Sequence, residues 1–210
     1  PGLASSLLVG LAYAKGLAAA SAKPFFGINH MEGHLLSPFL EEGTIPPHLS
    51  LIVSGGHTML ISVQAHGQYQ LLGRTIDDAI GEAFDKVAAM LDLGHPGGPE
   101  VERLAADGDA DAFDFPVANL GKDRLDFSFS GLKTAVLYAA KGQPGRTPPM
   151  LDEQRRADLA ASFQAPTIKA VRRNLGRAFD RHPQARSLRL ARGGPANSAL
   201  PHTPATESTA

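Results

Sequence analysis

Apolar residues recur with two different spacings along the chain, and these spacings predict its helices and strands. Apolar positions three and four residues apart predict helices at about 3–20, 30–40, 77–93, 99–107 and 152–180. Short continuous or alternating apolar runs predict strands at 25–29, 49–53, 58–63, 70–72 and 187–191. Glycine turns separate the three central strands, so these are expected to form an antiparallel meander. Strands followed by helices indicate an α/β fold that binds ligands at strand ends.

Two of the predicted helices carry more detailed expectations. The first is rich in alanine and leucine and is therefore expected to be buried. The helix at 77–93 is expected to begin with Asp77 or Asp78 as its N-cap. Its inner face should carry four apolar side chains, namely Ile80, Phe84, Val87 and Leu91. The stretch 95–150 is rich in glycine and proline and, apart from one helix, is expected to be irregular.

Composition narrows the classes of protein to which the chain can belong. At 210 residues and 43% apolar content it can bury a substantial core. The net charge of −1 provides no global basic field, so any contact with nucleic acid must be local. The absence of cysteine excludes disulfides, thiolate metal ligands and a cysteine nucleophile, and is compatible with a cytoplasmic location. No apolar run reaches the ~18 residues that span a membrane, so no membrane association is expected.

The run NHMEGH contains the first candidate site. His30 and His34 are four residues apart, so on a helix both imidazoles project from one face and can bind one metal ion. The same spacing occurs in zinc proteases, where a glutamate directly follows the first histidine as general base. Here Met31 takes that position and Glu32 comes one residue later, which argues against a protease. Two packed or surface histidines remain the alternative.

Two glycine pairs follow or precede predicted elements. The strand at 49–53 ends in Ser54-Gly55-Gly56, where backbone N–H groups can converge on an anion without interference from Cβ atoms. Gly97-Gly98 precedes a helix whose first turn leaves N–H groups free for a ligand. Ordinary turns explain either pair equally well.

Three acidic residues are predicted to lie on one face of the helix at 77–93. Asp78, Glu82 and Asp85 have the spacing i, i+4 and i+7, with Lys86 taken to lie off their stripe. Stacked like charges destabilise a helix slightly, so the stripe suggests a bound ligand such as a ribose, a cation or an amine. A solvated acidic face is the alternative.

Taken in order, these motifs resemble the family of tRNA N6-adenosine threonylcarbamoyltransferases, once described as O-sialoglycoprotein endopeptidases. The resemblance covers about residues 1–197 and rests on six runs: PGLASSLLVGLAYAKGLA, NHMEGH, IVSGGHT, IDDAIGEAFDKVA, PGGP and DFSFSGLKTA. It implies the two-lobe, ribonuclease-H-like α/β fold of actin, hexokinase and the heat-shock ATPases. Residues 1–48 would be the remainder of an incomplete first lobe that carries the metal-binding helix. Residues 49–197 would form the second lobe, with a helical insertion at about 95–150, and 198–210 a disordered tail.

The resemblance also implies an activity, ligands and partners. Members of the family transfer a threonylcarbamoyl group from threonylcarbamoyl-adenylate to N6 of adenosine 37 in tRNAs that read codons beginning with A. His30 and His34 would bind one divalent metal per subunit, either iron or zinc. The adenylate site would be lined by Ile52, Val53, Ser54, Gly55, Gly56, Asp85, Gly98, Glu102 and Asn197. The implied partners are tRNA, a paralogous partner subunit and the small ATPase of the same modification complex.

The chain departs from the family pattern at both ends. The family's opening strand is missing before Pro1, and nothing after Asn197 resembles the segment that supplies the third metal ligand, an aspartate. Arg192 replaces a glycine and Pro195 an alanine of the family's last glycine-rich run. We therefore expect a chain truncated at both ends. The alternative to an active transferase is an inactive binding module that only forms the complex, and a metalloprotease is the least favoured function.

Local basic groups are candidates for contacts with tRNA phosphates. They are Lys122, Arg124, Lys133, Arg172, Arg173 and Arg177. The alternative for the arginines is a solvated helix face. No chemistry follows from the run 126–136 on physical grounds alone.

Overall fold

A four-stranded mixed sheet forms the centre of the computed structural model, which describes residues 4–40 and 45–192. The strands are β1 (His48–Val53), β2 (Thr58–Ala65), β3 (Gln68–Arg74) and β4 (Leu188–Arg192), in the order β3-β2-β1-β4. β1, β2 and β3 pair antiparallel, which confirms the predicted meander, and β4 pairs with β1 in parallel. The predicted α/β class is thus confirmed.

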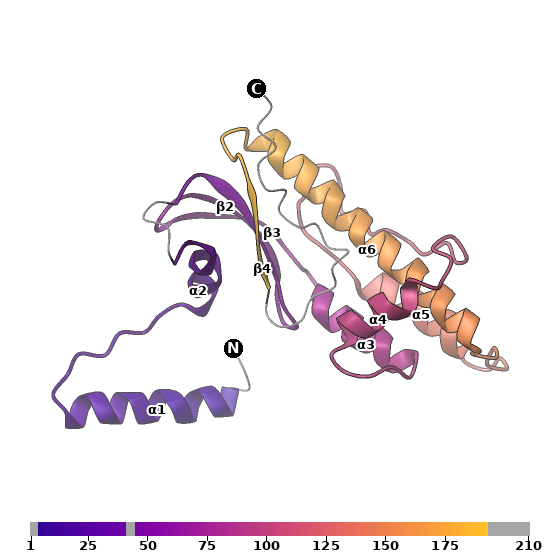
Figure 1. Cartoon of the computed structure of the whole chain (residues 1–210), viewed down its shortest axis with the longest axis horizontal. Coiled ribbons are helices and arrows are strands. Elements are labelled where there is room, and N and C mark those ends of the chain that lie inside the picture. The colour runs from indigo at the N-terminus through magenta and orange to yellow at the C-terminus, as the bar shows by residue number, and fades with distance from the viewer. Residues whose placement is uncertain (1–3, 41–44, 193–210) are drawn as a thin grey trace.

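The central strand β1 is buried on both faces because apolar clusters lie on either side of the sheet. Leu49 and Leu51 belong to the larger cluster, which the sheet forms with helices α3 to α6. Ile52 belongs to a smaller cluster on the opposite face, where Leu35 of helix α2 (His30–Leu36) packs. The 3-10 helix η1 (Ser37–Phe39) follows α2 directly. In Figure 1 α2 and the long helix α6 accordingly lie on opposite sides of the sheet.

Helix α3 (Ile80–Met90) shows the predicted inner face but not the predicted start. The side chains of Ile80, Phe84, Val87 and Leu91 are all buried, as expected. The N-cap position is Ala79, so capping by Asp77 or Asp78 is wrong. The hydroxyl of Thr58 on β2 accepts the hydrogen bond of the Ile80 N–H instead, at 2.8 Å. A tertiary contact therefore does the work of a local cap.

Helix α4 (Gly97–Ala105) was expected, whereas α5 (Ser130–Lys141) lies in the stretch predicted to be irregular. α5 has no local side-chain cap at Phe129. The Asp77 carboxylate accepts hydrogen bonds from the Phe129 N–H at 2.8 Å and from the hydroxyls of Ser128 and Ser130. The helix begins where a residue distant in sequence satisfies its first N–H groups, and this explains why local signals missed it.

Helix α6 (Glu153–Arg181) is the predicted long helix, with Asp152 as its N-cap. Several of its arginines donate hydrogen bonds to backbone carbonyls of the loop at 118–123, which precedes α5. Arg173 reaches Ala118, Arg177 reaches Gly121, and Arg181 reaches Lys122 and Asp123. These arginines therefore hold the loop at 118–123 against α6. Neither tRNA contact nor a solvated helix face, the two roles expected for the basic groups, includes this one.

Helix α1 (Ala4–Ala20) is not buried, contrary to expectation. Its large apolar side chains are exposed; Leu8, for example, is 66% exposed and Val9 71%. Figure 1 shows that α1 lies apart from the sheet and that an extended segment connects it to α2. That segment includes 25–29, where the predicted strand does not form, because no described strand pairs with it. Within the described residues, no helix is both long enough and apolar enough to cross a membrane.

Candidate active site

The two predicted metal-binding histidines lie on one face of α2. The Asn29 side chain caps this helix by accepting a hydrogen bond from the Met31 N–H at 2.9 Å. The rings of His30 and His34 are 4.3 Å apart between centroids and meet edge to face. The i, i+4 spacing thus places the two imidazoles side by side, as the sequence predicted.

The electrostatic surroundings of His30 favour its neutral form. Partial desolvation lowers the pKa of His30 from its usual 6.5, and repulsion from His34 and His57 lowers it further. His57 belongs to the turn between β1 and β2. The glycine turn therefore lies close enough to His30 for a charge on His57 to lower the pKa of His30. Neutral imidazole is the form that binds metals.

Two imidazole nitrogens suit a divalent metal of intermediate softness such as zinc or iron. Within residues 4–40 and 45–192, no group of three or more histidine, aspartate or glutamate side chains could hold a metal ion. His30 and His34 could therefore provide two ligands of a metal, and the described residues place no third beside them.

Glu32 is not placed to act as the base of a zinc protease. Its carboxylate accepts a hydrogen bond from the Tyr69 hydroxyl of β3 at 2.9 Å. Residues two apart on a helix are separated by about 200° around its axis, so Glu32 and His30 lie on nearly opposite sides of α2. This geometry agrees with the low weight given to a protease.

The glycine turn between β1 and β2 is closed by two reciprocal hydrogen bonds. The Ser54 N–H donates to the His57 carbonyl at 2.8 Å, and the His57 N–H donates to the Ser54 hydroxyl at 3.0 Å. Gly55 and Gly56 are exposed, and their N–H groups donate to no other described residue. These two N–H groups are therefore open to an anion.

Ile52 and Val53, also predicted to line the substrate site, are buried in β1. Both pair with β2 on one side and with β4 on the other. Their side chains consequently belong to the core, and Ser54 is the first residue of this run whose side chain is partly exposed.

Helix α3 connects the glycine turn to the second glycine pair through two close backbone approaches. A Cβ added at Gly81 would lie 2.7 Å from the Ser54 carbonyl oxygen, and one at Gly97 would lie 2.6 Å from the Phe84 carbonyl oxygen. Only glycine fits at either contact. Gly81 lies three residues before Phe84 and four before Asp85 on α3, a rise of about 5–6 Å. Both glycine segments therefore contact α3 within about one turn of each other.

Asp85 lies at the second of these contacts. Its carboxylate accepts a hydrogen bond from the Gly97 N–H at 2.7 Å and is 3.5 Å from Nδ1 of His95. Gly98 follows within α4, and Glu102 lies one turn further along the same helix and is half-buried. Along α3, the residue that contacts the glycine turn, Gly81, thus lies about one helical turn from Asp85, which binds the start of α4.

The predicted acidic stripe on α3 is wrong in two respects. Asp78 precedes the helix, and Lys86 lies four residues after Glu82, on the same stripe. Lys86 contacts Asp78 at 2.8 Å and Glu82 at 2.7 Å, and Lys133 of α5 contacts Asp78 at 2.6 Å. Ion pairs thus neutralise Asp78 and Glu82. These contacts raise the pKa of Lys86, and the two lysines lower that of Asp78 although its partial burial acts in the opposite direction.

Several residues that make the contacts described above were not identified as site residues from the sequence. They are His57, Thr58, Tyr69 and Asp77. Only His57 could have been noticed, because it directly follows Gly56. Among the basic candidates for tRNA contacts, Lys133 is paired with Asp78 and Arg124 with Asp126. Asn197 lies outside the described residues, as does the tail at 198–210.

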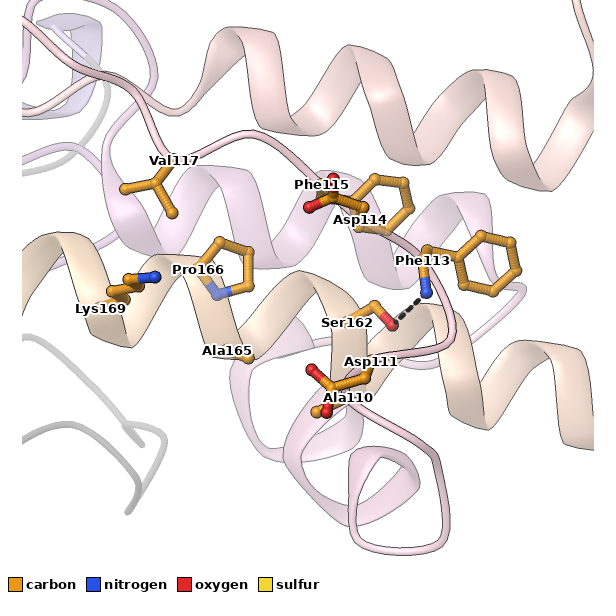
Figure 2. Close-up of a pocket in the computed structure, with 10 residues that line it drawn as sticks. All are labelled: Ala110, Asp111, Phe113, Asp114, Phe115, Val117, Ser162, Ala165, Pro166 and Lys169. Carbon is orange, nitrogen blue, oxygen red and sulfur yellow. Dashed lines mark hydrogen bonds between the residues drawn. The ribbon is translucent and has the colours of Figure 1, made fainter.

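A cavity of about 440 Å³ lies away from these residues, between the segment 110–117 and α6. Figure 2 shows Pro166 and Lys169 of α6 facing this segment, and the Ser162 hydroxyl accepting a hydrogen bond from the Phe113 N–H at 3.2 Å. None of the residues that line it belongs to the predicted site. This cavity is therefore separate from the glycine turn and from the Asp85 contact.

Comparison with known proteins identifies the family of the chain. The TsaD family, described as tRNA N6-adenosine threonylcarbamoyltransferase, matches residues 1–210. A relative of that name from Rhizobium etli is 53% identical over 181 residues, which cover 86% of this chain and 48% of the relative. Another, from Clostridium beijerinckii, is 46% identical over 205 residues, which cover 97% of this chain and 59% of the relative. The chain thus spans about half the length of these curated relatives. The chain belongs to the TsaD family, whose fold is of the α/β actin and hexokinase type.

Proposed function

We propose that the chain takes part in transferring a threonylcarbamoyl group from threonylcarbamoyl-adenylate to N6 of adenosine 37 in tRNAs that read codons beginning with A. The observation that carries this proposal is that α3 contacts the glycine turn at Gly81 and the start of α4 at Asp85, in a chain that matches the family throughout. A nucleotide held there would lie beside the face that carries the histidine pair.

The residues of this site divide the binding of an adenylate among them. The free N–H groups of Gly55 and Gly56 would donate to phosphate oxygens, and the cost of orienting them has been met during folding. The Asp85 carboxylate, held by the Gly97 N–H, would accept hydrogen bonds from ribose hydroxyls. Glu102 and Asn197 are proposed to complete the site. The adenine N6 amine is a weak nucleophile, so orientation by these groups would supply much of the rate.

His30 and His34 are proposed to bind one divalent metal, iron or alternatively zinc. When bound, the metal would polarise the carbamoyl carbonyl and neutralise charge on the leaving phosphate. The lowered pKa of His30 and the closeness of the two imidazoles on one helix face support this role.

The partners proposed for the chain are tRNA, a paralogous partner subunit and the small ATPase of the modification complex, in the cytoplasm. We also propose the two-lobe division, with residues 1–48 in one lobe and 49–197 in the other. Within residues 1–48, α1 lies apart from the sheet, whereas α2 packs on it.

The proposal is tested by modification of a tRNA that lacks the modified adenosine. The chain, its partner proteins, threonylcarbamoyl-adenylate and the tRNA are incubated together, and the nucleosides are analysed by mass spectrometry. We expect threonylcarbamoylated adenosine with the parent chain and with His66→Ala, an exposed histidine outside the site, and much less with Asp85→Asn. If the parent chain assembles with its partners but no adenosine is modified, the chain is a binding module and the transferase proposal is wrong.

A further inference from the structure

Helix α2 is too short to hold its own orientation. It has seven residues, and isolated helices of fewer than about 12 residues are marginal in water. Its one buried side chain is Leu35, beside which Met31 is partly buried against the sheet. Apolar contacts of this kind are not directional, so they hold the helix on the sheet without fixing its rotation.

A directional contact is made on the other flank of the helix. The Tyr69 hydroxyl donates to Glu32 Oε1 at 2.9 Å, and both side chains are partly buried. This side-chain hydrogen bond joins α2 to strand β3. Burial and the neighbouring Glu32 carboxylate raise the pKa of Tyr69, so the phenol keeps its proton and remains a donor near neutral pH.

The sheet presents Tyr69 to α2 through an irregularity in strand pairing. Tyr69 pairs with Val63, and the register shifts between Val63 and Ala65 directly beside this pair. Such irregularities change the direction of side chains at a sheet edge, and β3 is the edge strand. The contact therefore joins the sheet edge to the middle of α2.

The rotation of α2 decides where both imidazoles lie. With side chains a helix has a radius of about 5–6 Å, so a rotation of ~20° moves a side-chain tip by about 2 Å. Metal–ligand distances hold within about 0.2 Å. The pair moves together in such a rotation, and its position changes relative to the glycine turn and to any further ligand.

We infer that Tyr69 is a positioning residue, whose hydrogen bond to Glu32 fixes the rotation of α2 and so sets the position of His30 and His34 for metal binding. The inference rests on the proposed metal site and deepens it. Glu32 acts here as the acceptor that holds the helix, from the side opposite to the imidazoles.

The positioning role is tested first without metal, by hydrogen exchange of backbone amides in the full chain. Tyr69→Phe removes the hydroxyl and keeps the ring, and Tyr138→Phe makes the same change at an exposed position on α5. We expect faster exchange within residues 31–36 for Tyr69→Phe alone, with unchanged exchange in β1 and α3. Unchanged exchange in α2, or faster exchange throughout the chain, would overturn the positioning role.

The second measurement is the dissociation constant for Zn²⁺, from competition with a chromophoric chelator. Hydrogen bonds to charged groups justify an expected weakening of up to about tenfold for Tyr69→Phe and none for Tyr138→Phe. Glu32→Ala should match Tyr69→Phe, and the double variant should be no weaker than either, because both remove one hydrogen bond. Additive losses, or an unchanged dissociation constant despite faster exchange in α2, would show that the hydrogen bond does not serve metal binding.

The two measurements distinguish this inference from the proposed function. If the parent chain binds Zn²⁺ no better than the variant His30→Ala with His34→Ala, the metal site itself is wrong. In that case Tyr69 does not serve metal binding either. The exchange result still decides whether Tyr69 holds α2 in its orientation.

Discussion

The Asp77 carboxylate accepts a hydrogen bond from the Phe129 N–H at 2.8 Å, although 52 residues separate the two in sequence. The contact joins the segment before α3 to the first turn of α5. The run at 126–136, whose residue types alone indicate no chemistry, is thereby held against the segment that leads into α3.

Replacing Asp77 should destabilise the chain through loss of this cap. Asp77→Ala removes an acceptor for the Phe129 N–H and for the hydroxyls of Ser128 and Ser130. A lost helix cap costs about 1–2 kcal/mol in free energy of unfolding, which urea denaturation measures. Asp114→Ala, an exposed loop aspartate, is the control and should change it by less than about 0.5 kcal/mol. Equal effects of the two substitutions would contradict the capping role.

The ion pair between Lys133 and Asp78 should contribute more than a surface pair. Their side chains are 23% and 14% exposed, whereas those of Arg103 and Glu100 are 70% and 37% exposed. Lys133→Met should lower the free energy of unfolding by about 1–3 kcal/mol, because it removes a hydrogen-bonded partner from a mostly buried carboxylate. Arg103→Met should cost less than about 1 kcal/mol. Denaturation curves that show the larger loss for Arg103→Met would contradict this ranking.

The close approach at Gly81 should tolerate no side chain. Gly81→Ala would bring Cβ to 2.7 Å from the Ser54 carbonyl oxygen, and we expect a loss of about 1–3 kcal/mol in free energy of unfolding. Gly176→Ala in α6 meets no atom within 4 Å and should instead stabilise the chain by about 0.5–1 kcal/mol. The change in free energy of unfolding caused by Gly→Ala should therefore have opposite signs in the two helices. Thermal unfolding of both variants measures this, and two losses of equal size would refute the contact.

Stability should fall as the solution is acidified, in part because of His48. Burial lowers the pKa of His48 from 6.5, and repulsion from Arg189 acts in the same direction, although a hydrogen bond with the Pro46 carbonyl opposes both. Below pH ~6.5 the unfolded chain therefore takes up a proton at this residue that the folded chain binds less readily, so the free energy of unfolding decreases as the pH falls.

The variant His48→Leu should show a smaller decrease than the parent chain when urea denaturation is compared at about pH 7.5 and pH 5.5. The ring of Phe39 and the Arg189 side chain bound this position, and His48 Nε2 has no hydrogen-bond partner there. The exposed His66 is the control, and His66→Leu should retain the full slope. An unchanged slope in His48→Leu would contradict the assignment.

The sequence predicted elements whose signals are local and missed those whose signals are not. The inner face of α3 follows from apolar periodicity, because Ile80, Phe84, Val87 and Leu91 pack on one side. The starts of α3 and α5 depend on hydrogen bonds that backbone N–H groups donate to Thr58 and Asp77 across the fold, so no local pattern indicates either. Long-range contacts of this kind set helix boundaries independently of propensity.

The candidate site shows the same division. The spacing of His30 and His34 was sufficient to place their rings together, and the glycine pairs indicated close backbone approaches. The use of carboxylates was less predictable. Asp78 and Glu82 are occupied by lysines, and Asp85 holds the Gly97 N–H, because which charges meet depends on how α3, α4 and α5 pack.

The most direct test of the account is the metal content of the purified chain and of two single variants. Elemental analysis should find divalent metal in the parent chain, and both His30→Ala and His34→Ala should lose most of it, because each removes one of two adjacent imidazole ligands. His66→Ala should retain the parent content. Unchanged metal in both His30→Ala and His34→Ala would contradict the central claim that these two histidines form part of one metal site.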